Sequence, residues 1–110
     1  MNYASALSVV RRYLDEKLPI ATNSRANRLE FETRSYSRWA ADEILERIME
    51  EELKLPYHIS GLEQRVPIEI VQEYIDELYT AWESTVDKKR KYMYSTAMHT
   101  ADEILSLLYF

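Results

Sequence analysis

Hydrophobic residues recur along most of this chain at intervals of three and four positions, which is the spacing of one face of an α-helix. The first such stripe consists of Tyr3, Leu7, Val10 and Leu14. Pro19 cannot continue the helix, because proline lacks the backbone N–H and its ring clashes with the preceding turn. The pattern therefore predicts a first helix that ends after Leu18.

Three further stripes predict three more helices. The second helix begins near Ser35 or Ser37, either of which can cap it, and ends before Pro56. The third opens at Pro67, because proline is favoured in the first helical turn. The fourth follows the segment 84–87, Ser-Thr-Val-Asp, which matches a capping box, although Ser95 is a rival start. The stripes of these three helices are Ala41, Ile44, Leu45, Ile48; Val71, Tyr74, Ile75, Leu78, Trp82; and Tyr94, Ala97, Ala101, Ile104, Leu105, Leu108.

The segment between the first two predicted helices, residues 19–34, breaks this pattern. Its end, Arg28–Arg34, alternates weakly between polar and apolar residues, which also suits a short extended strand, and we assign it to a long loop. Four amphipathic helices with a short connection between the last two predict an all-α fold. We expect an antiparallel helical bundle that forms a single domain over residues 1–110.

Composition narrows the possible functions. The chain of 110 residues has no Cys, which excludes disulfides, thiolate chemistry and zinc fingers. Its single Gly, Gly61, excludes the glycine-rich loops that bind nucleotide phosphates. The start of the chain lacks the pattern of a signal peptide, and no apolar run reaches the roughly 18 residues of a membrane span. We therefore expect a cytoplasmic protein without a membrane partner.

Charge is distributed unevenly along the chain. The net charge is −5, yet residues 41–83 alone carry twelve acidic and three basic side chains. The predicted second and third helices should therefore form an acidic surface, beside a basic loop that contains Arg25, Arg28 and Arg34. A phosphate-binding surface should be basic, so we do not expect direct binding of nucleic acid.

One acidic pattern suggests chemistry. The segment Asp42-Glu43-Ile-Leu-Glu46, followed later by Glu73-Tyr-Ile-Asp76, resembles the paired acidic motifs of the all-α nucleotide pyrophosphatases of the MazG type. That resemblance implies Mg²⁺ ions held by Glu43, Glu46, Glu73 and Asp76 against a nucleoside triphosphate. Helical phase, however, places both carboxylate pairs opposite the apolar stripes. We therefore expect them to face outward on separate helices, and we predict no catalysis and no cofactor.

Several aromatic residues lie off the predicted core stripes. Trp39 falls on the outward side of the second helix, and Tyr92 and Phe110 fall on the back of the fourth. His99 and Glu103 lie on that same back, one turn apart, where we expect them to pair in solvent. Such aromatic residues contact either another part of this chain or another chain, and exposed Trp, Tyr and Arg dominate binding surfaces.

These observations predict a small acidic module that binds another protein. The expected partner surface consists of Trp39, Glu43, Glu46, Glu50, Glu73, Asp76, Arg25, Arg28 and Arg34. In size and charge the chain is similar to small inhibitors encoded by phages and mobile elements, including anti-CRISPR and other anti-defence proteins. That resemblance implies a partner whose basic groove binds nucleic acid. Two alternatives remain: the Mg²⁺-dependent pyrophosphatase, and a structural homodimer formed through Tyr92, Leu107 and Phe110.

Overall fold

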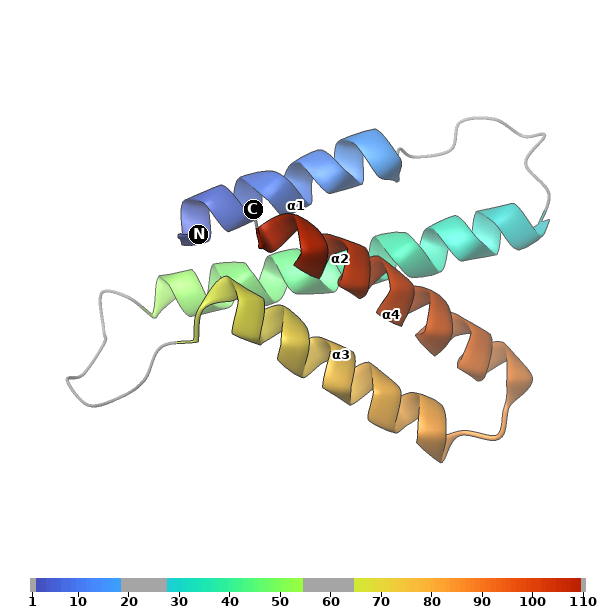
Figure 1. Ribbon diagram of the computed structural model, residues 1–110. Helices are drawn as coiled ribbons and strands as arrows, with labels where there is room; N and C mark the ends of the chain where they lie inside the picture. The colour runs from blue at the N-terminus through green and yellow to red at the C-terminus, as the bar shows by residue number, and fades with distance from the viewer. Residues whose placement is uncertain (1, 19–27, 55–64, 110) are drawn as a thin grey trace.

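The chain folds as two helical hairpins packed across each other (Figure 1). The computed structural model describes residues 2–18, 28–54 and 65–109, and for residues 28–31 the backbone alone. The four helices are α1 (Tyr3–Lys17), α2 (Arg28–Leu53), α3 (Pro67–Ser84) and α4 (Lys88–Leu108). Within each hairpin, α1 with α2 and α3 with α4, the helices run antiparallel. The predicted all-α bundle is thus confirmed.

The helix ends follow from local capping. The side chain of Asn2 accepts a hydrogen bond from the backbone N–H of Ser5 at 2.7 Å, which caps the start of α1. That helix ends at Lys17, close to the predicted limit, and α3 opens at Pro67 as predicted. Helix α4 begins at Lys88, directly after the segment 84–87 as predicted, but Ser84 does not cap it. Ser84 is the last residue of α3, and Asp87 caps α4 through the backbone N–H of Lys89.

The start of α2 was predicted wrongly. The helix begins at Arg28, so Arg28–Arg34 is neither loop nor strand. Seven weakly alternating residues cannot establish a period by themselves, and this part of α2 also makes contacts with a distant residue of α4. The hydroxyl of Thr33 shares a hydrogen bond with that of Tyr92, and the ring of Tyr36 meets Tyr92 edge-on, with centroids 6.1 Å apart. Residues 19–27 of the predicted loop lie outside the described residues.

One hydrophobic core joins all four helices. Helices α2 and α4 each pack against the other three, so they occupy the centre of the bundle. The largest fully buried apolar side chains are Ile44, Ile48, Ile70, Ile104, Leu108, Val10 and Val71. Nearly all of them fall on the predicted stripes, which shows that the helical phases were assigned correctly. Leu45, Ile75 and Leu105 pack against the margin of the core and are only partly buried.

Candidate functional site

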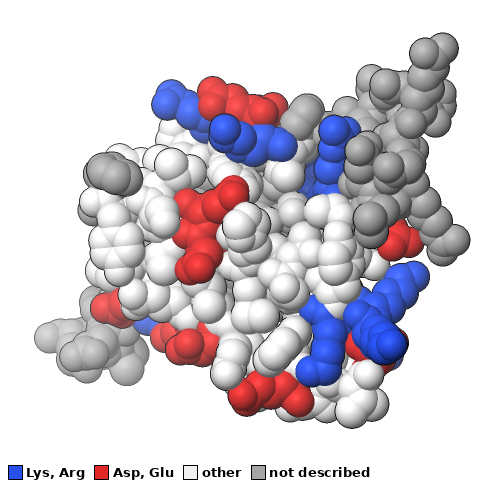
Figure 2. Space-filling view, turned by 45° about the vertical axis from the view of Figure 1, so that its right-hand side comes forward, with Lys and Arg blue, Asp and Glu red and all other residues white. Residues whose placement is uncertain are grey.

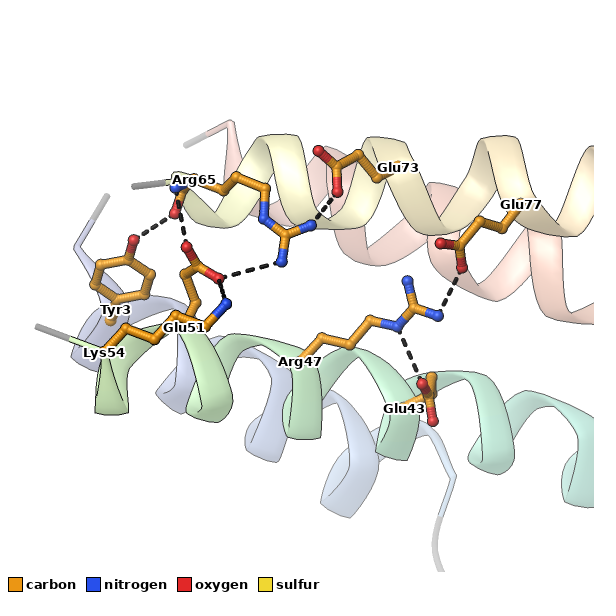
Figure 3. Close-up of polar contacts among 8 residues, drawn as sticks. All are labelled: Tyr3, Glu43, Arg47, Glu51, Lys54, Arg65, Glu73 and Glu77. Atoms are coloured by element: carbon orange, nitrogen blue, oxygen red, sulfur yellow. Dashed lines mark hydrogen bonds and ion pairs between the residues drawn. The ribbon is translucent and has the colours of Figure 1, made fainter. Parts of the chain in front are cut away.

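A charged seam joins α2 to α3, and Arg47 forms its middle (Figure 3). The guanidinium of Arg47 donates hydrogen bonds to Glu43 on its own helix, at 3.0 Å, and to Glu77 on α3, at 2.6 Å. It also lies 4.7 Å from the ring centroid of Tyr74. Burial disfavours the charge on Arg47, but the hydrogen bonds that Arg47 donates to Glu77 and Glu43 outweigh burial, so the pKa of Arg47 is raised.

A second cluster closes the end of the same seam around Glu51, which is only 4% exposed. Its carboxylate accepts hydrogen bonds from the backbone N–H of Arg65 at 3.2 Å, from the Arg65 guanidinium at 3.1 Å and from Lys54 at 3.1 Å. The Arg65 guanidinium also pairs with Glu73, and the hydroxyl of Tyr3 donates to the Arg65 carbonyl. This cluster therefore ties the ends of three helices together (Figure 3).

The electrostatics of Glu51 follow from these bonds. Burial by itself raises the pKa of a carboxyl, because the charged form loses its hydration. In Glu51 the hydrogen bonds from Lys54 and from the backbone and guanidinium of Arg65 outweigh burial, so its pKa lies below the ordinary value. Glu51 is thus a buried carboxylate that stays ionised because cationic donors surround it.

The carboxylates of the pyrophosphatase-like motif lie differently from the expectation. Glu46 and Asp76 are exposed, as predicted. Glu43 and Glu73 do not simply face outward, because they border the seam and pair with Arg47 and Arg65. No three His, Cys, Asp or Glu side chains in the described ranges gather closely enough to hold a metal ion. The positive charge between these acidic helices comes from two arginines.

A different surface lies along the solvent side of α2, and we call it the outer α2 face. It exposes three large apolar side chains, Trp39 at 44%, Met49 at 41% and Leu53 at 70%. Exposed carboxylates lie among them at Asp42, Glu46 and Glu50. Within the described part of the chain, none of these three carboxylates has an ion-pair partner. The face follows one side of α2 for about 20 Å, at 1.5 Å per residue.

The remaining predicted partner residues do not form a basic loop. Arg34 is exposed, but it lies on α2 instead of in a loop, and Arg28 is the first residue of that helix. Arg25 lies outside the described residues, so its place in the predicted surface stays a prediction. The sequence predicted that Trp39 lies beside an arginine-rich loop. In the structure Trp39, Arg28 and Arg34 all belong to the helix α2.

The back of α4 is partly covered. Tyr92 contacts Tyr36 of α2, so part of its surface is used within the chain. Leu107 is exposed beside a shallow groove of about 190 Å³, which α1 and α4 line with residues that include Val9 and Tyr13. Phe110 lies outside the described residues. The predicted pairing of His99 with Glu103 is confirmed at 3.1 Å.

Figure 2 shows that charge on one face of the molecule is mixed. At the upper edge of this view basic and acidic side chains lie side by side, a further basic group lies at the lower right, and other acidic side chains lie left of centre and along the lower edge, around a broad uncharged area. The predicted acidic surface is also weakened by Arg47 and Arg65, which neutralise part of it. The acidic excess of residues 41–83 therefore does not translate directly into a uniform acidic wall.

Comparisons with known proteins give no information on the function of this chain. The chain matches no protein-family model, no curated protein and no solved structure. Across the described ranges, none of the helices has an apolar stretch of the length required to traverse a bilayer.

Proposed function

We propose that this protein acts by binding another protein through the outer α2 face, and that recognition, without catalysis, is its activity. The observation that supports this proposal is the exposure of Trp39, Met49 and Leu53 along one line of a helix. Single exposed apolar residues are ordinary on protein surfaces, whereas several large ones on one side of a helix, with carboxylates among them, suit a binding surface. Trp is also the residue type most enriched at the centre of interfaces.

The charges on this face define the chemistry of the partner. Asp42, Glu46 and Glu50 have no cation to neutralise them within the described chain, so a partner with Lys or Arg around an apolar pocket would complement them. The carboxylates would speed the encounter, and Trp39 would hold the complex once formed. A more specific form of the proposal is that the partner's basic groove binds nucleic acid. The chain would then act as an inhibitor of the phage or mobile-element type.

A photo-crosslinking experiment tests the surface directly. A photoreactive amino acid replaces Met49 on the outer α2 face, and in a matched control it replaces Arg11, which is exposed on α1. We expect a specific protein adduct from position 49 and none from position 11. Adducts of equal yield at both positions, or none at position 49 in lysate of the native host, would contradict the proposal.

Kinetics with the captured partner then separate the two kinds of contact. Reversal of charge with Glu46→Lys and Glu50→Lys should slow association about tenfold at low salt, while Trp39→Ala should chiefly speed dissociation. Asp15→Lys on α1 makes the same change of charge as Glu46→Lys or Glu50→Lys alone, on an exposed carboxylate away from the face. It should leave both rates close to those of the unmodified protein. Equal effects of Asp15→Lys and Glu46→Lys would mean that net charge alone governs binding.

A further inference from the structure

Helices α3 and α4 meet along a second exposed line, which we call the α3–α4 outer seam. At one end the ammonium of Lys91 lies 4.2 Å from the ring centroid of Trp82, and Tyr79 stacks on the same Trp with centroids 6.0 Å apart. At the other end the amide of Gln72 donates to the hydroxyl of Tyr109 at 3.2 Å. The Lys91–Trp82 and Gln72–Tyr109 contacts cross between the two helices and mark both ends of the seam.

The middle of the seam is apolar. Ile75 of α3 and Tyr94, Met98 and Leu105 of α4 lie between the two marked ends, and each remains partly exposed. They stand apart from the side of α4 that faces the first hairpin, which is marked by the contact of Glu103 with Tyr13. The solvent side of a bundle helix is ordinarily polar. These four side chains pack against the margin of the core and leave only part of their apolar surface open to solvent along the α3–α4 outer seam.

Charge at the two ends of this seam makes it complementary to itself. Lys91 and Asp102 are eleven residues apart on α4, which separates them by about 16 Å along the axis and only about 20° around it. Asp102 is exposed, and its carboxylate has no ion-pair partner among the residues that the structure describes. In two antiparallel copies of α4 related by a two-fold axis near Met98, each Lys91 would face the partner's Asp102. An interface with this symmetry uses the same patch on both subunits.

We propose that the α3–α4 outer seam binds a second copy of this chain in an antiparallel, two-fold dimer. Met98 lies near its centre, and two Lys91–Asp102 ion pairs close its ends. This dimer uses a different side of α4 from the one with Tyr92 and Leu107, which the sequence suggested for self-association. It leaves the outer α2 face accessible, and it does not rest on the proposed function.

Exchange of charge tests this geometry. Sedimentation velocity over a concentration series measures the dimer dissociation constant for the unmodified chain, Lys91→Glu, Asp102→Lys and the double variant. We expect a dimer at tens of micromolar, a loss of affinity of about tenfold in each single variant, and recovery to within about threefold of the original in the double variant. Recovery in the double variant is the result expected when residue 91 of one copy faces residue 102 of the other.

Two controls keep the result specific. Lys89→Glu makes the same change in the same helical turn but on a different side of α4, and it should leave dimerisation unaffected. Met98→Glu places two carboxylates near the axis and should abolish the dimer, with helical content by circular dichroism showing that the fold persists. A chain that stays monomeric up to about 200 µM, a double variant no tighter than the single ones, or an equal effect of Lys89→Glu would overturn the proposal.

Discussion

Replacing Glu51 by Gln removes one negative charge from the buried end of the charged seam while it keeps the shape of the side chain. Glu51 accepts hydrogen bonds from Lys54 and from both the backbone and the guanidinium of Arg65. Glutamine retains a single acceptor oxygen, and its amide group is a donor that would face other donors. We expect the free energy of unfolding to fall, because the two cations lose a charged acceptor.

The magnitude follows from the exposure of the partners. Hydrogen bonds to charged groups contribute about 1.5–3 kcal/mol each, and breaking a buried ion pair costs about 3–5 kcal/mol. Only Glu51 is buried here, since the side chains of Lys54 and Arg65 are 62% and 41% exposed and regain water when the carboxylate is lost. Solvent screening therefore reduces the expected loss to about 1–2 kcal/mol at neutral pH.

The pH dependence gives this prediction a second measurement. The pKa of Glu51 is lowered in the folded state, so the carboxylate stabilises the fold at pH values above the unfolded pKa of about 4.3. That contribution is lost as the pH falls through the lower folded pKa. The difference between the original chain and Glu51→Gln should therefore be full at pH 7 and shrink toward pH 3.

Urea denaturation at pH 7, 5, 4 and 3, followed by circular dichroism, measures this difference. Glu50→Gln is the matched control, because Glu50 is the preceding residue and is exposed, and its loss should change stability by less than about 0.5 kcal/mol. A Glu51→Gln loss no larger than that of the control at pH 7 would refute the reasoning. So would a loss that stays constant down to pH 3.

Three further predictions test the core, the proposed absence of catalysis and a buried phenol. Leu78→Ala should destabilise the fold by about 2–5 kcal/mol in denaturant melts, because Leu78 is buried in the core. The chain with Mg²⁺ and a panel of nucleoside triphosphates should release no pyrophosphate, and release that disappears in Glu43→Gln/Glu73→Gln would overturn the binding proposal. The Tyr13 hydroxyl donates to Glu103 at 2.5 Å, and burial and this carboxylate raise its pKa. That contact should stabilise the fold at pH values below the unfolded pKa of about 10, and its contribution should decline as the pH rises above that value. The decline of stability with pH should be smaller in Tyr13→Phe, which lacks the hydroxyl.

Helical phase was the part of the fold that could be predicted from the sequence. The spacing of Ala41, Ile44 and Ile48 identified the buried side of α2, and Pro67 marked the start of α3. Local signals were sufficient in both cases, because apolar periodicity and proline geometry act within one or two turns. The start of α2 could not be predicted in this way, since its first turns are held by Tyr92, which lies 59 residues beyond Thr33.

The charged seam was only partly predictable. Glu43 and Arg47 are four residues apart on one helix, so their pairing was open to inference, and Glu51 falls on the same stripe as Ile44 and Ile48. A carboxylate at a core position indicates a cationic partner. Its identity was not accessible, because Arg65 reaches Glu51 from another element and nothing in the local sequence of Arg65 points there.

The central place of α4 has a consequence for synthesis on the ribosome. This helix packs against the other three, yet it is the last of the four to be made. Its buried residues Ile104 and Leu108 lie in its final turns, and the contact of Tyr13 with Glu103 spans 90 positions. Because chains emerge N-terminus first, α1 and α2 can pack on each other early, but the parts of their apolar faces that contact α4 stay uncovered until it is made. A nascent chain stopped before Ile104 should therefore stay sensitive to proteases, and resistance should arise only when the last turns of α4 become available.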